Sequence, residues 1–209
     1  MDFDRLSADY KNSLATATNK YHEALAGGPA ISYLEARGIT AEVASTFRLG
    51  YVSEPEVGHE ASKGRLAIPF LSPTGVVDLR FRAIDDVQPK YLGTGGSRTH
   101  LFNVRDLHTG SRYVAICEGE LDTVVMSGLV GVPALGITGV SNWKSHYKHC
   151  FADFDRVFIV MDGDEPGRNA ARKLRGELSN SVIVDLQEGD VNECFLGKGA
   201  DYIKERLGL

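Results

Sequence analysis

The sequence has few cysteines, and their spacing excludes both a disulfide framework and a zinc ribbon. The chain of 209 residues holds only Cys117, Cys150 and Cys194. Their number is odd, and no two of them form a Cys-x-x-Cys pair. We therefore expect buried free thiols at these positions and no zinc site in this chain.

Long apolar runs are also missing. No stretch approaches the roughly 20 apolar residues that a membrane-spanning helix needs, and the acidic, polar start MDFDRLSADYKN lacks the order of a signal peptide. We therefore expect a cytoplasmic protein with no membrane partner. With 43% hydrophobic and 24% charged residues, the composition is that of a globular chain with one core or two smaller ones.

An excess of positive charge is the third missing feature. The net charge of −5 argues against nucleic-acid binding by bulk electrostatics, because lysine and arginine are the residues that neutralise phosphates. The charges are unevenly distributed, however, and residues 63–105 are locally basic. The basic residues of this stretch are Lys63, Arg65, Arg80, Arg82, Lys90, Arg98 and Arg105.

The N-terminal half reads as short helices followed by a small sheet. Between residues 14 and 47 the apolar positions recur at helical spacing, with glycine and proline breaks. The polar segment 54–64 predicts a linker or a mobile loop. The stretches RLAIPFL, VVDLRFRAI and YLGTGG then predict a small antiparallel sheet whose outward positions carry basic residues.

From residue 113 onward, apolar strands alternate with amphipathic helices, which predicts a parallel sheet with helices on both faces. The predicted strands are YVAIC, VPALGIT, RVFIVM and SVIVDL, and helices are expected up to about 129, around 143–150 and up to about 178. The expected fold class is α/β, with an α+β N-terminal subdomain at 1–110 and a parallel-sheet domain at 111–209. Ligands bind at the carboxyl ends of strands in such sheets.

Acidic residues follow three of these predicted strands. Crowded carboxylates repel one another unless a cation neutralises them, and oxygen ligands without histidine or cysteine favour magnesium or manganese. We predict Glu118, Asp162 and Asp164 as catalytic metal ligands. The third group comprises Glu188 and Asp190 with Asn192 just beyond, and from it Asp190 and Asn192 are expected to complete the metal shell.

Each acidic piece also has a plain structural interpretation. EGE after a strand is often a solvated helix start, and DGD followed by EPG is also found in helix capping and in calcium-like loops. The repetition at successive strand ends favours the metal site. Asp122, four residues after Glu118, is expected to support the site, whereas Glu120 is expected to be an exposed residue at the start of a helix.

At these residues the sequence resembles the toprim domain of topoisomerases, primases and several nucleases. CEGELD resembles its glutamate motif, VMDGDEPGRNAA its DxD motif, and EGDVNE the third acidic segment of primases. Two further parts resemble the catalytic core of DnaG-type bacterial and phage DNA primases in particular. They are YLEARGITAEVASTFRLGYV and the series GRLAIPF, LRFRAI, PKYLGT and HLFN.

The resemblance implies a nucleotidyltransferase that uses Mg²⁺ or Mn²⁺ to make short RNA primers from ribonucleoside triphosphates on single-stranded DNA. It implies that Arg65, Arg82, Lys90 and Tyr91 form a basic groove for template or nucleotide. Arg168, just inside the helix after DGD, is expected to reach a phosphate or to pair with a cluster acid. The alternative for each basic residue is a solvated surface charge.

The chain also departs from the family pattern. No cysteine pair precedes the core, and the sequence ends at Leu209 soon after the toprim segment, so we expect neither a zinc-binding module nor a helicase-binding bundle within it. A replicative helicase and a separate zinc-binding module are therefore candidate partners. A toprim nuclease and a nucleic-acid-binding replication accessory protein remain alternative functions, because the same acids or the basic stretch alone would serve them.

Overall fold

The computed structural model describes residues 6–95, 99–187 and 189–209, so Arg98 and Glu188 lie outside the described residues. The chain forms two compact units. Unit 1 comprises Met1–Ala36 and Thr40–Arg98, and unit 2 comprises Arg37–Ile39 and Thr99–Leu209. We had placed residues 99–110 with the N-terminal subdomain, whereas in the structure they pack with unit 2.

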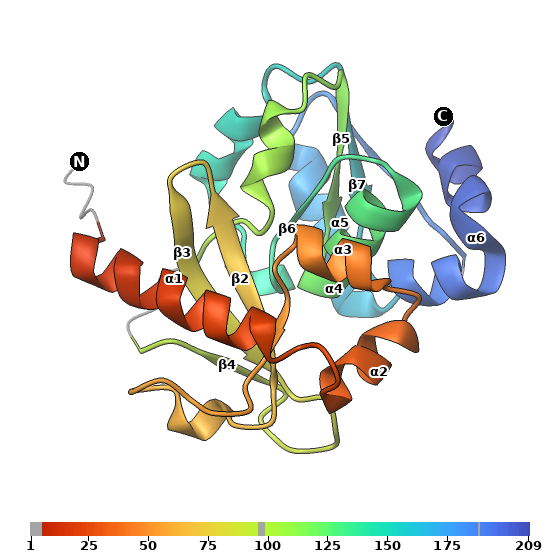
Figure 1. Cartoon of the computed structure of the whole chain (residues 1–209). Helices are drawn as coiled ribbons and strands as arrows, with labels where there is room; N and C mark the ends of the chain where they lie inside the picture. The colour runs from red at the N-terminus through yellow and green to blue at the C-terminus, as the bar shows by residue number, and fades with distance from the viewer. Residues whose placement is uncertain (1–5, 96–98, 188) are drawn as a thin grey trace. The chain divides into compact units, whose positions relative to one another are not determined.

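Unit 1 combines three helices with a four-stranded antiparallel sheet of order β1-β2-β3-β4 (Figure 1). The sheet confirms the small antiparallel sheet predicted from the sequence. The elements are α1 (Ala8–Glu23), α2 (Pro29–Glu35), α3 (Ala41–Thr46), β1 (Gly50–Tyr51), the 3₁₀ turn η1 (Glu60–Ser62), β2 (Leu66–Ser72), β3 (Gly75–Arg82) and β4 (Tyr91–Gly93).

Helix α1 supplies one wall of the unit 1 core. The hydroxyl of Ser7 caps its first turn by accepting a hydrogen bond from the backbone N–H of Tyr10 at 3.2 Å. Leu14, Ala17 and Tyr21 follow at helical spacing on one face and are almost completely buried. They pack on the sheet with Val52, Ala67, Val76, Leu79 and Phe81.

The segment 54–64 is fastened to α1, so the prediction of a linker was wrong. The hydroxyl of Tyr21 lies 2.8 Å from His59 Nδ1 and also accepts a hydrogen bond from the backbone N–H of Glu56 at 2.8 Å. Lys20 forms an ion pair with Glu56 at 2.6 Å. The polar composition that suggested a linker therefore reflects polar anchoring within one unit.

Gly50 is the position where β1 passes closest to α1, and we expect Gly50→Ala to destabilise the protein. A Cβ atom at residue 50 would lie 2.5 Å from the backbone carbon of Tyr21, so the helix or the strand would have to move. Overpacking of this kind costs about 1–3 kcal/mol of unfolding free energy. Chemical denaturation should show that loss, whereas Gly95→Ala, where a Cβ meets nothing within 4 Å, should be nearly neutral. Equal stabilities would contradict the close approach.

Unit 2 is built on a four-stranded parallel sheet of order β6-β5-β7-β8, which confirms the predicted α/β fold. Its strands are β5 (Tyr113–Cys117), β6 (Ala134–Gly136), β7 (Arg156–Val160) and β8 (Ser181–Ile183). Its helices are η2 (Val104–His108), α4 (Glu120–Val125), the π-helical η3 (Met126–Val130), η4 (Val140–Asn142), η5 (Ser145–Phe151), α5 (Glu165–Glu177) and α6 (Val191–Leu207).

Helices cover both faces of this sheet, as the alternation of apolar residues predicts. Val114 and Ile116 of β5 belong to the core cluster that contains Ala171 and Leu174 of α5. The alternate residues of β5, such as Cys117, face α4, where the thiol of Cys117 is hydrogen-bonded to Thr123. The core therefore lies on both sides of β5 and β7, and the strand ends remain at its margin.

Two expectations for this unit were wrong. Residues 143–150 do not form one helix, because Trp143 and Lys144 take extended backbone angles and separate the 3₁₀ helices η4 and η5. Cys117 and Cys194 are buried as expected, but Cys150 is exposed, because it lies on the solvent side of η5.

Helix α6 changes direction at Gly199, whose φ of 82° and ψ of 175° are non-helical. The kink divides the 17-residue helix into two shorter pieces. Across the described ranges, no helix is long and apolar enough to cross a membrane.

Candidate metal and nucleic-acid site

The parallel register of β5 and β7 brings the first acids together. Cys117 pairs with Val160, so Glu118 and Asp162 follow neighbouring strand ends. Burial, together with the charges of Asp162 and Asp164, raises the pKa of Glu118 to about 7, although a hydrogen bond from the backbone N–H of Asp162 acts in the opposite direction. Oε2 of Glu118 is buried and has no hydrogen-bond partner within the described part of the chain.

Asp164 caps helix α5. Its Oδ1 accepts a hydrogen bond from the backbone N–H of Gly167 at 2.7 Å, and Pro166 occupies the first turn, where a proline costs no hydrogen bond. Gly167 is required because a Cβ there would lie 2.2 Å from the carbonyl oxygen of Asp162. The sequence DGDEPG therefore fixes both carboxylates at the end of β7.

Asp190 caps helix α6 and belongs to the third acidic group. Its Oδ1 accepts a hydrogen bond from the backbone N–H of Glu193 at 2.7 Å. The backbone N–H of Asn192 donates to Asp122 Oδ1 at 3.3 Å, and the Asn192 amide donates to the carbonyl of Arg37 at 2.7 Å. Asp122 thus contacts the start of α6, and Asn192, only 9% exposed, connects α6 to residues 37–39.

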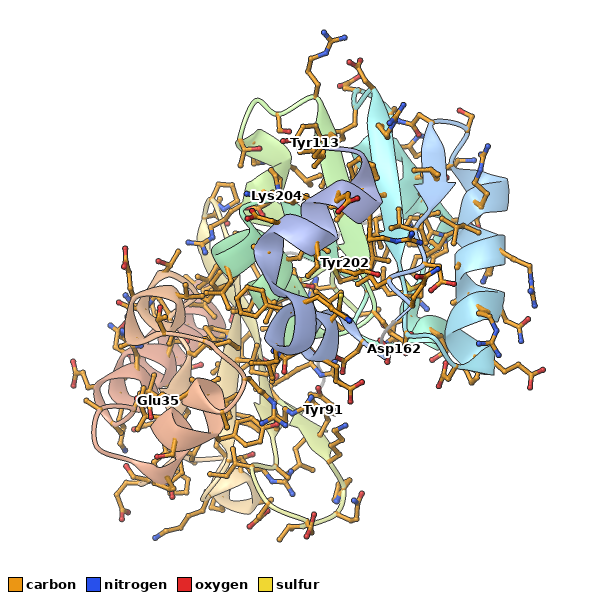
Figure 2. The ribbon with its side chains drawn as sticks, turned by 90° about the vertical axis from the view of Figure 1, so that its right-hand side faces the viewer. Glu35, Tyr91, Tyr113, Asp162, Tyr202 and Lys204 are labelled. Carbon is orange, nitrogen blue, oxygen red and sulfur yellow. The ribbon has the colours of Figure 1, made fainter. Side chains whose placement is uncertain are left out.

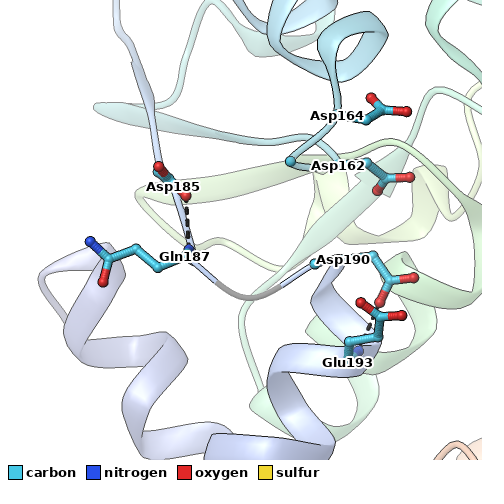
Figure 3. A pocket seen from close by; sticks show the side chains of 8 residues that line it. Asp162, Asp164, Asp185, Gln187, Asp190 and Glu193 are labelled. Atoms are coloured by element: carbon cyan, nitrogen blue, oxygen red, sulfur yellow. Dashed lines mark hydrogen bonds between the residues drawn. The ribbon is translucent and has the colours of Figure 1, made fainter.

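These strand and helix ends surround an open pocket of about 440 Å³. Figure 3 shows the carboxylates of Asp162, Asp164 and Asp190 on the same side of it. Among the described residues that line it there is no lysine or arginine, so its charged lining side chains are all acidic. The lining residues are Asp162, Gly163, Asp164, Asp185, Gln187, Gly189, Asp190 and Glu193.

Three of these lining residues, Asp185, Gln187 and Glu193, were missed by the sequence reasoning. Asp185 follows β8, and its Oδ1 accepts a hydrogen bond from the backbone N–H of Gln187 at 2.8 Å. Because Asp185 belongs to the apolar stretch SVIVDL, the rule that ligands gather at strand ends could have included it. Glu193 lies in the first turn of α6 and ends the segment EGDVNE, from which only Asp190 and Asn192 were predicted as ligands.

In the described part of the chain, no three Asp, Glu, His or Cys side chains lie close enough together to hold one metal ion. Mutual repulsion of uncompensated carboxylates favours such separation, and Glu188 of the third acidic group lies outside the described residues. The buried, unpartnered oxygen of Glu118 and the pocket whose charged lining residues are all acidic nevertheless fit a hard divalent cation. The assignment of Glu118, Asp162, Asp164, Asp190 and Asn192 as ligands stays a prediction.

The structure corrects the expectation for Glu120, which is buried, with 1% of its surface exposed. We therefore expect Glu120→Ala to lower the free energy of unfolding by about 1–3 kcal/mol, because the groups that a buried carboxylate contacts lose their partner. Glu165 is the matched control, since it is also the first residue of a helix but is exposed. Denaturation curves should separate the two alanine variants, and equal losses would contradict the burial of Glu120.

Unit 1 holds the predicted basic residues at the pairing of β3 with β4, where Arg82 lies opposite Tyr91. Arg82 Nε donates to the Tyr33 hydroxyl at 2.6 Å, and Arg82 Nη1 donates to the Tyr91 hydroxyl. The guanidinium of Arg80 stacks 4.6 Å from the centre of the Tyr91 ring. Tyr91 is labelled in Figure 2 among these side chains.

Arg65 and Lys90 have different positions in this cluster. Arg65 is only 6% exposed, and its Nη1 donates to the carbonyl oxygens of Pro89 at 2.8 Å and Lys90 at 3.4 Å. Lys90 is exposed. Arg65 therefore shapes the turn that presents Lys90 and Tyr91, instead of facing solvent as an outward strand charge.

Arg168 lies near the acids of unit 2. It is exposed in the first turn of α5, and its Nη1 donates to the carbonyl of Gly163. It also lines a smaller pocket of about 240 Å³ together with Asp162 and Arg172. The predicted site residues thus form two groups, one basic and aromatic in unit 1 and one mainly acidic in unit 2.

Comparison with known proteins identifies the family. No family model matches the sequence. The Gene 57 protein of Mycobacterium phage D29 is 38% identical over 151 residues, which cover 69% of this chain and 99% of that protein. The DNA primase of Pseudomonas aeruginosa is 24% identical over 232 residues, covering 90% of this chain and 34% of that protein. The Aquifex aeolicus primase structure with its zinc-binding and RNA polymerase domains matches 100% of this chain and 63% of that chain, with 21% identity and a TM-score of 0.79.

The chain belongs to the DnaG-type primase family. This confirms the resemblance read from its motifs. The chain spans about a third of the length of the Pseudomonas primase that it matches. At 21% identity the Aquifex structure shows the shared fold, and the chemistry is inferred from the site.

Proposed function

We propose that this chain is the catalytic core of a DNA primase, which joins ribonucleotides on a single-stranded DNA template by metal-dependent nucleotidyl transfer. The observation that supports it most is the pocket after β7 and β8, whose charged lining residues are all acidic, together with the buried, unpartnered oxygen of Glu118 after the neighbouring strand β5. Crowded acids of this kind serve phosphoryl chemistry when a cation neutralises them.

Glu118, Asp162 and Asp164 would hold Mg²⁺ or Mn²⁺, with Asp190 and Asn192 completing the shell directly or through water. When bound, the cation makes the attacking 3′-hydroxyl more acidic and neutralises the triphosphate. Gly167 and the cap of Asp164 keep both carboxylates of β7 in place before the nucleotide arrives. Asp122 contacts the start of α6 and supports the third group.

The basic cluster of unit 1 would hold the template. Lys90 is exposed beside Tyr91, and Arg82 is fixed between two tyrosines, which suits contacts to the phosphates of single-stranded DNA. A DnaG primase catalytic domain with the same fold, 18% identical and with a TM-score of 0.76, is known bound to single-stranded DNA. Arg168, near the acids, would contact a phosphate of the incoming ribonucleotide.

Template selection would need a second surface. Contacts to phosphates carry no base information, so we propose that a separate zinc-binding module selects the start site and that a replicative helicase is a further partner. The fold is also that of the primase fragment of the bacteriophage T7 primase-helicase protein, with a TM-score of 0.68. We expect the isolated chain to initiate with loose sequence choice and to be more active with Mn²⁺, which binds such ligands more tightly.

A nuclease would use the same acids to activate water, and one experiment separates the two activities. The protein is incubated with single-stranded DNA, Mg²⁺ or Mn²⁺ and labelled ribonucleoside triphosphates, and one gel is examined for short RNA and for shortened DNA. Template-dependent RNA with intact DNA supports the primase. Shortened DNA without RNA supports the nuclease, and DNA binding without either product supports an accessory protein.

A further inference from the structure

The side chain of Arg82 is fixed on two sides by tyrosines. Nε donates to the Tyr33 hydroxyl at 2.6 Å, and Nη1 donates to the Tyr91 hydroxyl. The guanidinium carbon lies 5.2 Å from the ring centre of Tyr91 and 5.9 Å from that of Tyr33. Tyr91 comes from β4, directly opposite Arg82 in the sheet, whereas Tyr33 comes from helix α2.

The hydroxyls of Tyr33 and Tyr91 each bind one nitrogen of the Arg82 guanidinium, Nε and Nη1, and do not bind the third nitrogen, Nη2. A guanidinium has five N–H donors in a planar fork. Within the described residues, Nη2 of Arg82 has no hydrogen-bond partner. The Arg82 side chain is partly exposed. The arrangement therefore orients the guanidinium so that the Nη2 edge is available to an anion, as expected for a phosphate contact.

Tyr33 is itself held rigidly. Its neighbours on α2, Ala30 and Leu34, are completely buried, and the helix begins at Pro29, whose fixed φ favours a first turn. The Tyr33 hydroxyl thus lies at a defined position. A long arginine side chain loses much rotamer freedom when it is fixed, so a partner that fixes it before binding increases affinity by reducing that cost.

We propose that Tyr33 is a positioning residue for template binding, which holds Arg82 ready to contact a phosphate of single-stranded DNA. This inference rests on the proposed function and names a residue that the sequence motifs did not single out. The ring of Tyr33 packs at the side of Arg82, and its hydroxyl fixes the direction of the guanidinium. Removal of the hydroxyl alone leaves no cavity, so the effect should appear in binding.

The test compares Tyr33→Phe, Arg82→Ala and the double variant by fluorescence anisotropy with a labelled single-stranded oligonucleotide over a series of salt concentrations. Tyr33→Phe should weaken binding by about two- to tenfold, the range of one ordinary hydrogen bond. Arg82→Ala should reduce the salt slope by about 0.7 if one phosphate contact is lost. The double variant should bind like Arg82→Ala, because Tyr33 acts only through Arg82.

Tyr10→Phe is the matched control, since it also removes a partly buried hydroxyl of unit 1, one that donates to Thr94 at 3.0 Å away from Arg82. Both tyrosine variants should lose similar thermal stability, but Tyr10→Phe should bind DNA like the wild type. In primer synthesis, Tyr33→Phe should raise the KM for template with an unchanged kcat.

Two outcomes of the comparison between variants would overturn the inference. One is equal DNA affinity of Tyr33→Phe and Tyr10→Phe, and the other is additive losses in the double variant. A wild-type protein that does not bind single-stranded DNA at all would also overturn it. If the binding series follows the expectation while no variant and no wild type makes RNA, the proposed synthesis fails and the role of Tyr33 stands.

Discussion

Asp162→Asn is expected to reduce primer synthesis by roughly a hundredfold or more, since loss of even a supporting group of a metal site costs 10- to 100-fold. The substitution keeps the shape of the side chain and removes one charge next to Glu118. It also relieves the repulsion that raises the Glu118 pKa, so the protein should stay folded. Incorporation of labelled ribonucleotides and circular dichroism measure the two effects.

Glu165→Gln provides the control for this prediction, because Glu165 is an exposed acid three residues along the same turn and does not line the pocket. It should retain nearly full synthesis. Asp164→Asn should behave like Asp162→Asn, although its amide side chain still accepts the N-cap hydrogen bond from Gly167. Undiminished synthesis in either aspartate variant would remove the end of β7 from the active site.

Glu118→Gln should abolish synthesis and, unusually for a site variant, stabilise the metal-free protein. The reason is that Glu118 is destabilised as an anion: burial and the charges of Asp162 and Asp164 raise its pKa to about 7 in the folded state from 4.5. Between these two values the folded state binds the proton more tightly than the unfolded state does. The metal-free wild type should therefore lose stability as the pH rises from about 4.5 to 7.

Thermal unfolding in EDTA and in Mg²⁺ measures this prediction. At pH 8 the melting temperature of Glu118→Gln in EDTA should exceed that of the wild type, and the difference should shrink as the pH falls below 7. Mg²⁺ should raise the melting temperature of the wild type, because a ligand that binds the folded state stabilises it, but not that of the variant. Two results would contradict this account of Glu118. One is a wild-type melting temperature that does not change with Mg²⁺, and the other is a variant that melts below the wild type in EDTA at pH 8.

The positions of the acids after β5 and β7 were predictable because they follow from local sequence. A strand that ends in an acid places it at the carboxyl edge of a parallel sheet, and adjacent strands bring such ends together. This applies to Glu118 and Asp162, whose strands pair in register. The start of α5 was predictable in the same way, because Pro166 favours the first turn of a helix.

Other features depend on tertiary contacts that no short pattern encodes. The hydrogen bond between Tyr33 and Arg82 joins residues 49 positions apart, on a helix and a strand. Glu120 sits in a first turn that looks solvated in sequence, yet the turn packs inward and buries it. Arg65 directly precedes β2, in a stretch whose charges were expected to point outward, whereas its guanidinium donates to the carbonyls of residues 89 and 90.

The central claim is that a divalent cation binds among the acids that follow β5, β7 and β8. The most direct measurement replaces Mg²⁺ with Fe²⁺ and maps where ascorbate and peroxide cut the polypeptide, since radicals formed at the bound iron break only nearby backbone. The account predicts cuts near Glu118, near Asp162 to Asp164 and near Asp190, all suppressed by excess Mg²⁺ and absent in Asp162→Asn. Cuts elsewhere in the chain, or cuts at these places that persist in Asp162→Asn, would contradict it.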